Sequence, residues 1–138
     1  ICRSLKNEKG VVEVIRRCNE LDVALVGIGY PNQNSAIMKT GYYDRDDIKE
    51  FKKRKVAGDV SMQMYDIHGQ TKPYEADNNV IGVNIKKLRR VPYSIGVAGG
   101  IDKINAIQGA ISGRYINVLI TDVDCAKELI KRKKEETR

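Results

Sequence analysis

Apolar and polar positions along the chain follow two periods, and the last third shows both most clearly. Residues 94–98 form a short apolar run before a glycine pair, which is typical of a buried strand. From 101 to 111, isoleucines and alanines recur three and four residues apart, which predicts a helix that ends at Gly113. A second apolar run at 118–121 predicts another buried strand. This βαβ order predicts two parallel, neighbouring strands.

The remaining pattern predicts the other elements of an α/β domain with a parallel sheet and flanking helices. Apolar faces predict helices, and short β-branched runs predict strands. In the helix at 46–55, Ile48 and Phe51 should turn inward, and Thr121 or Asp122 should cap the last helix. We expect helices at 8–20, 35–40, 46–55, 85–91 and 123–134, strands at 22–26 and 80–83, and a strand or pair of strands at 57–66.

Composition fits a single globular domain with an aliphatic core. The chain has 138 residues, of which 41% are hydrophobic and 31% charged, with one Phe and no Trp. An Ile-, Val- and Leu-based core suits a parallel sheet beneath helices. Three cysteines without CxxC spacing, Cys2, Cys18 and Cys125, argue against a disulfide framework or a zinc site. Cys18 and Cys125 fall on apolar helix positions, so we expect them in the core.

Charge and targeting signals narrow the partners. The formal net charge of +7 permits anionic partners, either phosphorylated metabolites or nucleic acid. Basic runs at 52–55, 86–90 and 131–134 are more typical of solvated helix faces and helix C-termini than of a binding surface. None of these basic runs alternates with aromatic residues, so a nucleic-acid-binding module is the least supported hypothesis. The sequence shows no signal peptide or membrane-spanning run, and we expect a cytoplasmic protein without membrane partners.

Candidate anion-binding chemistry follows the predicted strands. Gly99 and Gly100 precede a helix N-terminus, where unpaired N–H groups and the helix dipole favour an anion. Lys103 adds a full charge in the first turn, although most helix lysines are simply exposed to solvent, and the pattern alone favours that interpretation. Gly27 and Gly29 follow the strand at 22–26 and are placed to line a ligand crevice. The third glycine of a dinucleotide fingerprint is missing.

Acidic residues are the second kind of candidate. Asp59 and Asp66 lie in the stretch at 57–66, where each is either a turn cap or a carboxylate that accepts hydrogen bonds from sugar hydroxyls. His68 is the single histidine and has no serine or cysteine pattern around it that would make a nucleophilic dyad. We expect His68 to be a turn residue.

Four segments in order carry a family resemblance. The segments are DVALVGIGYP, AGDVSMQMYDIHG, the stretch around VIGVNIKKLRRVP, and VAGGIDKINAI followed by INVLITDVDCAKELI. Through these segments, the chain resembles the SorC/DeoR-type bacterial sugar-binding transcriptional regulators over roughly its last 120 residues. This resemblance implies a Rossmann-like fold similar to the sugar-phosphate isomerase and glucosamine-phosphate deaminase type. It also implies binding of a phosphorylated sugar.

The resemblance further implies a domain assignment and a set of ligand residues. Residues 1–138 correspond to the C-terminal part of the effector domain, and the helix-turn-helix that binds DNA and the first part of the domain lie outside this chain. A homo-oligomer is expected, with no cofactor and no metal. Polar residues at 78 and 79 match the family only loosely. The implied ligand-binding residues are Gly27, Gly29, Gly58, Asp59, Asp66, Ala98, Gly99, Gly100 and Lys103, with Lys103 on the phosphate.

Two functions of different classes remain. The first is an effector-sensing domain without catalysis, which modulates DNA binding or assembly of a full-length regulator. The second is a sugar-phosphate isomerase- or deaminase-like enzyme, because fold alone does not decide between them. An enzyme needs a positioned acid–base pair, and the candidates Asp59, Asp66 and His68 lack the denser acidic and histidine motifs of those enzymes. The sequence therefore favours the sensing domain.

Overall fold

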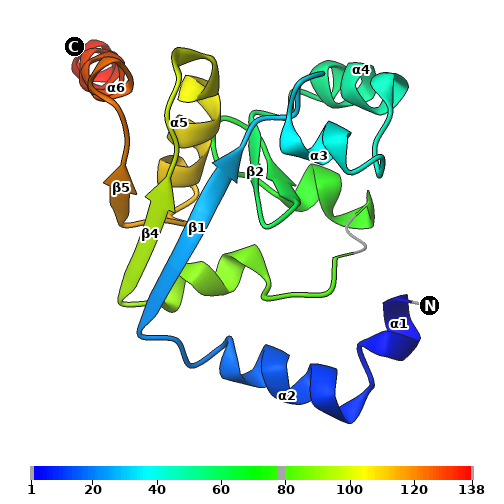
Figure 1. The fold of residues 1–138 in the computed structure, drawn as a ribbon. Coiled ribbons are helices and arrows are strands. Elements are labelled where there is room, and N and C mark those ends of the chain that lie inside the picture. Colours follow the sequence, from blue (N-terminus) through cyan, green and yellow to red (C-terminus); the bar gives the residue numbers. More distant parts are fainter. Residues whose placement is uncertain (1, 78–79, 138) are drawn as a thin grey trace.

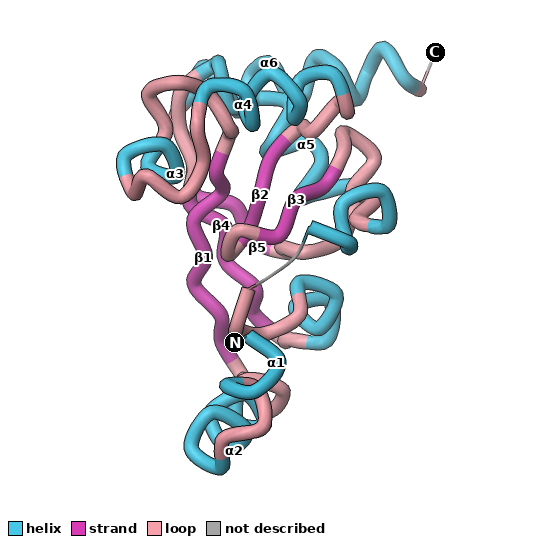
Figure 2. The backbone as a smooth tube through the Cα atoms, turned by 90° about the vertical axis from the view of Figure 1, so that its right-hand side faces the viewer, coloured by secondary structure: helices cyan, strands magenta, loops and turns pink. Residues whose placement is uncertain are grey.

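The computed structural model describes residues 2–77 and 80–137 as a five-stranded sheet with helices around it (Figures 1 and 2). The strands are β1 (Val23–Gly29), β2 (Gly58–Val60), β3 (Gln63–Tyr65), β4 (Tyr93–Val97) and β5 (Val118–Ile120). The α-helices are α1 (Cys2–Leu5), α2 (Lys9–Arg17), α3 (Ala36–Lys39), α4 (Arg45–Lys53), α5 (Ile104–Ser112) and α6 (Val123–Glu136). Short 3₁₀ helices are η1 (Lys72–Asp77), η2 (Ile85–Arg90) and η3 (Ile101–Lys103).

The sheet is mixed, with the order β3-β2-β1-β4-β5. Strands β1, β4 and β5 are parallel, so the predicted βαβ unit around α5 is confirmed. Strands β2 and β3 form an antiparallel hairpin on the other side of β1. The α/β class is therefore confirmed, and the stretch at 57–66 is a pair of strands. Figure 1 shows the arrowheads of β1, β4 and β5 at the same edge of the sheet.

The predicted strand at 80–83 is wrong, because this segment has no ladder partner. The side chain of Gln63 on β3 binds the backbone here in place of a partner strand. Its Nε2 donates to the Val83 carbonyl at 2.7 Å, and its Oε1 accepts the Ile85 N–H at 2.9 Å. The residues predicted as a helix at 85–91 form the 3₁₀ helix η2. The positions 78 and 79 lie outside the described residues.

Helix α5 covers one face of the sheet, and the main core lies between them. Its Ala106, Ile107 and Ala110 are fully buried against inward side chains such as Ile28 of β1. A second cluster forms beneath α4, where Ile48 and Phe51 turn inward as predicted. Asp44 begins α4 with a capping box, in which its side chain accepts the Asp46 and Asp47 N–H groups.

Helix α5 ends at Ser112 with Gly113 as its C-cap, so the predicted glycine stop is confirmed, but the reason for the glycine is different. Gly113 is the C-cap but has an ordinary φ of −73°, and the left-handed residue is the next one, Arg114, with φ of 56°. Gly113 is needed for a different reason: a Cβ there would lie 2.3 Å from the Tyr115 ring. Packing, not backbone conformation, therefore selects this glycine.

The opposite face of the parallel strands is uncovered and apolar. The register places Val23 beside Tyr93, Leu25 beside Ile95, and Val97 beside Ile120. Leu25 is 69% exposed and Ile120 is 54% exposed. Parallel sheets are normally covered on both faces. The exposed side chains of this open sheet face are Val23, Leu25, Tyr93, Val97, Val118 and Ile120.

Helix α2 also leaves its apolar side unburied. Figures 1 and 2 both show α2 near the amino end of β1, away from α5, and none of its residues is buried. Cys18 is only half-buried, so its predicted core position is wrong, whereas Cys125 is fully buried as predicted. Over residues 2–77 and 80–137, no helix is long and apolar enough to cross a membrane.

Candidate functional site

A cavity of about 560 Å³ opens at the carboxyl ends of β1 and β4. The chain leaves β1 toward β2 and leaves β4 toward β5 on the opposite side, and open α/β sheets bind ligands where such connections diverge. Three segments distant in sequence build the wall. They contribute Gly27, Ile28, Gly29, Tyr30, Asn32, Asn34 and Ser35 after β1, Asp59, Ser61 and Met62 from the hairpin, and Asp102 and Lys103 from η3.

Asp59 is the buried acid of this cavity. Its side chain is 6% exposed, and Oδ2 accepts the Met62 N–H at 3.1 Å, while Oδ1 has no hydrogen-bond partner. Burial raises the pKa of the Asp59 carboxyl above its ordinary value, and the Met62 N–H and the Lys103 charge partly oppose this shift. A buried polar atom without a partner is costly, so Oδ1 is suited to accept a hydrogen bond from a ligand.

Lys103 is the cation of the cavity. It reaches from η3 across to β1, where its Nζ donates to the Ile28 carbonyl at 3.3 Å. An ammonium group carries three donors, so this contact leaves donors for an anion. Lys103 and Asp59 line the same cavity although 44 positions separate them in the sequence. The site therefore pairs one positive charge with one buried hydrogen-bond acceptor.

The glycines named from the sequence have different surroundings. Gly27 and Gly29 line the cavity, and Gly29 faces Asp59 across the β1–β2 ladder. A Cβ on Gly29 would lie 2.0 Å from Asp59 Oδ1. Gly58 lies outside the cavity, against α5, where a Cβ would lie 2.5 Å from the Ala106 Cβ. Gly29 thus gives Asp59 room, and Gly58 lets α5 approach the sheet.

The turn between β4 and η3 is held by an internal carboxylate. The Gly100 N–H donates to Asp122 Oδ2 at 2.7 Å, and Asp122 also caps α6 by accepting the Cys125 N–H. These hydrogen bonds lower the pKa of Asp122 to about 2. Ala98, Gly99 and Gly100 are not among the cavity residues. One N–H of the predicted anion-binding turn is therefore already satisfied within the chain.

Asp66 and His68 lie together in a turn outside the cavity. Asp66 Oδ1 accepts the His68 N–H at 2.9 Å and the Gln70 N–H at 2.8 Å. The turn prediction for His68 is confirmed. Asp66 has the geometry of a turn cap, which was one of its two predicted roles. Among the described residues, no group of three or more His, Cys, Asp or Glu side chains could hold a metal ion.

Several cavity residues were not identified from the sequence. Two Asn and a Ser follow β1, where Asn32 Oδ1 accepts the Asn34 N–H and Ser35 donates to the Asn32 carbonyl. These residues could have been predicted from their position directly after the glycine loop of a buried strand, because ligands bind at that edge of an open sheet. The newly identified residues are Tyr30, Asn32, Asn34, Ser35, Ser61, Met62 and Asp102.

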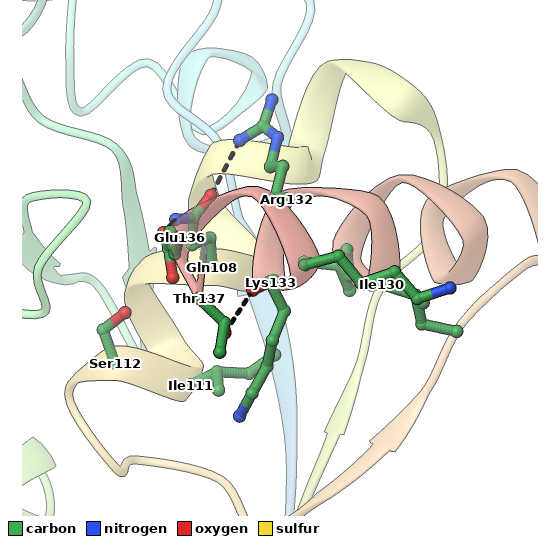
Figure 3. Close-up of a pocket in the computed structure, with 10 residues that line it drawn as sticks. Gln108, Ile111, Ser112, Ile130, Arg132, Lys133, Glu136 and Thr137 are labelled. Carbon is green, nitrogen blue, oxygen red and sulfur yellow. Dashed lines mark hydrogen bonds between the residues drawn. The ribbon is translucent and has the colours of Figure 1, made fainter.

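A second cavity, of about 580 Å³, lies between α5 and α6 (Figure 3). In its lining, Gln108 accepts a hydrogen bond from Arg132 and donates one to Glu136. Ile111 and Ile130 provide an apolar lining. This groove lies on the helices and contains no buried unpartnered polar atom. The cavity at the strand ends is therefore the better candidate for a polar ligand.

The chain is similar to known proteins over most of its length. A family model described as "Putative sugar-binding domain" matches residues 1–131. The sorbitol operon regulator of Klebsiella pneumoniae is 38% identical over 113 residues, which cover 82% of this chain and 36% of the relative. The chain thus spans less than half the length of this relative. The resemblance inferred from the four sequence segments is confirmed.

Solved structures agree with this result. The full-length sorbitol operon regulator SorC from Klebsiella pneumoniae matches with a TM-score of 0.78 and 32% identity, over 92% of this chain and 40% of that chain. A DeoR family transcriptional regulator from Listeria monocytogenes matches with a TM-score of 0.84 and 26% identity, over 91% of this chain and 51% of that chain. The Rossmann-like fold is thereby confirmed.

Proposed function

The chain belongs to the sugar-binding domain family of SorC/DeoR-type transcriptional regulators, and from this premise we propose that it is an effector-sensing domain that binds a phosphorylated sugar. The observation that carries the proposal is the pairing of Lys103 with Asp59 in one cavity. A phosphoryl group needs a cation, and sugar hydroxyls need a buried acceptor. Gly27 and Gly29 complete this wall without side chains.

In a full-length regulator, the sugar phosphate would act by binding two states of the protein with different affinity. A ligand that binds both states equally shifts no equilibrium. DNA contact belongs to a helix-turn-helix outside these 138 residues, and homo-oligomerisation and a cytoplasmic location complete the proposal. Residues 1–138 would be the C-terminal part of the effector domain. The open sheet face supports this, because a further layer of the same domain would cover it.

Thermal shift with sugar monophosphates and bisphosphates tests the proposal directly. A ligand at about 100 times its dissociation constant should add about 2.7 kcal/mol to the free energy of unfolding. We expect Lys103→Ala to abolish this stabilisation. Lys87→Ala, an exposed lysine on η2, serves as the matched control and should keep it. Absence of a shift with every phosphate, or an equal shift in Lys103→Ala, would refute the proposed site.

Binding without turnover is the second part of the proposal. The relatives are regulators, and the cavity holds one buried carboxylate and no histidine. An isomerase or deaminase needs a positioned acid–base pair. Chromatographic analysis of each sugar phosphate after incubation with the protein distinguishes the alternatives. Turnover that Asp59→Asn abolishes would favour the enzyme.

A further inference from the structure

The hairpin between β2 and β3 has an unusual turn. Val60 pairs with Gln63, so Ser61 and Met62 are the two turn residues, with φ of 51° and 60°. Two successive positive φ values define a type I′ turn, which strongly favours Asn-Gly or Gly-Gly. Side chains with a Cβ are strained in this region. The chain therefore keeps a Ser and a Met where glycine would be more stable.

Structural roles within the domain do not explain these two side chains. Met62 belongs to neither core cluster, and the Ser61 hydroxyl makes no hydrogen bond among the described residues. The Met62 N–H holds Asp59 Oδ2 at 3.1 Å, but glycine would supply the same N–H. The hydrogen bond thus accounts for the path of the backbone and leaves the residue types unexplained.

Both residues line the candidate cavity. Ser61 and Met62 contribute to its wall beside Asp59, and Lys103 is part of the same wall. Ser61 is exposed, and Met62 is half-buried. A sugar presents hydroxyl groups together with apolar C–H faces, and a hydroxyl beside a thioether complements both. Backbone strain retained at a ligand cavity is a recurrent sign of a functional constraint.

We propose that Ser61 and Met62 are specificity-determining residues of the sugar-phosphate site. Ser61 hydrogen-bonds a ligand hydroxyl, and Met62 packs against the carbon skeleton of the sugar. This inference rests on the proposed function, since it assigns sugar selectivity to a strained turn in that same cavity. The turn discriminates between sugars of different size or hydroxyl pattern, and Lys103 holds the phosphoryl group common to all of them.

The test uses Ser61→Gly and Met62→Gly, each of which relieves strain and retains the backbone N–H. Isothermal titration measures the dissociation constants of glucose 6-phosphate and ribose 5-phosphate, as a hexose and a pentose probe. We expect each variant to raise the melting temperature of the ligand-free protein by about 3 to 8 °C. The ratio of the two dissociation constants should change about tenfold, because one sugar loses more contacts than the other.

Arg114→Gly is the matched control. Arg114 has φ of 56° and is not among the cavity residues, so glycine there relieves the same strain away from the site. It should raise the melting temperature and leave both dissociation constants unchanged. A dissociation-constant ratio within twofold of wild type in both turn variants would overturn the inference while leaving the sensing function standing. If the wild-type protein binds no sugar phosphate in the thermal-shift panel, the proposed function fails and the inference fails with it.

Discussion

At the scale of single residues, the site depends on how tightly the β1–β2 ladder closes around one carboxylate. Asp59 faces Gly29, and its Oδ1 occupies the volume that a side chain on Gly29 would need. The same oxygen has no hydrogen-bond partner. A glycine on one strand therefore keeps an unsatisfied acceptor available on the next strand.

Alanine at this glycine should displace the carboxylate. A Cβ on residue 29 would lie 2.0 Å from Asp59 Oδ1, so we expect Gly29→Ala to lower the free energy of unfolding by about 1 to 3 kcal/mol and to weaken ligand binding. Gly27→Ala is the control on the same strand, because nothing lies within 4 Å of its Cβ. Urea unfolding of both variants measures the difference, and equal stabilities would contradict this account.

Residue types with a strong local signal could be named from the sequence. Asp59 and Lys103 followed from a glycine turn, a helix start and a family resemblance, but their shared cavity depends on the pairing of β1 with both β2 and β4. The hydrogen bond from Gly100 to Asp122 could not be predicted in the same way. It joins residues 22 positions apart, and no local pattern encodes that contact.

At the scale of elements, Asp122 joins the start of α6 to the turn after β4. It accepts the Cys125 N–H within its own helix and the Gly100 N–H of a different segment. Both hydrogen bonds require an acceptor, and the ionised carboxylate is the stronger one. Its protonation should therefore loosen the β4–η3 connection and the α6 N-terminus together.

This carboxylate predicts a stability change in acid. Its pKa is about 2 in the folded protein and 3.8 ordinarily. Because the folded value is the lower one, its contribution is present above about pH 4 and is lost as the pH falls toward 2. We expect Asp122→Asn, which keeps a capping oxygen, to flatten the fall in stability across this window. Urea titrations at several pH values measure this slope, and a wild-type slope in Asp122→Asn would contradict the prediction.

Element type was predictable where periodicity and tertiary packing agree. The elements predicted around β4, α5 and β5 are confirmed within one to three residues. The predicted burial of the strand at 118–121 is wrong, because Val118 and Ile120 lie on the open sheet face. The strand at 80–83 failed because a β-branched run needs a partner strand, and Gln63 binds the backbone there through its side chain instead. A side chain that takes the place of a partner strand in hydrogen bonding leaves no periodic pattern in the sequence.

At the scale of the whole molecule, the two faces of the parallel strands are unequal. One face packs on α5, and the open sheet face exposes six apolar side chains on three adjacent strands. A contiguous apolar patch of this kind marks a surface that another layer of protein covers. We therefore expect the 138-residue chain to self-associate through this face.

Self-association of the isolated chain is the expected consequence. We predict that its apparent mass in sedimentation velocity rises with concentration and that Leu25→Gln reduces this rise. The substitution should change the free energy of unfolding by no more than about 0.5 kcal/mol, since Leu25 is 69% exposed. Ile101→Gln is the control, an exposed isoleucine away from the open sheet face. An unchanged concentration dependence in Leu25→Gln would show that other surfaces drive association.

The cavity walls come from three stretches of chain, and the contact of Lys103 with Ile28 spans 75 positions. Closing such long loops costs entropy, which the packing of the domain has to overcome. During translation, a nascent chain that has not yet extended past Lys103 contains β1 and the hairpin but lacks the lysine that lines the cavity. Under the proposed function, a bound sugar phosphate would therefore report that these three stretches of chain have come together in one cavity.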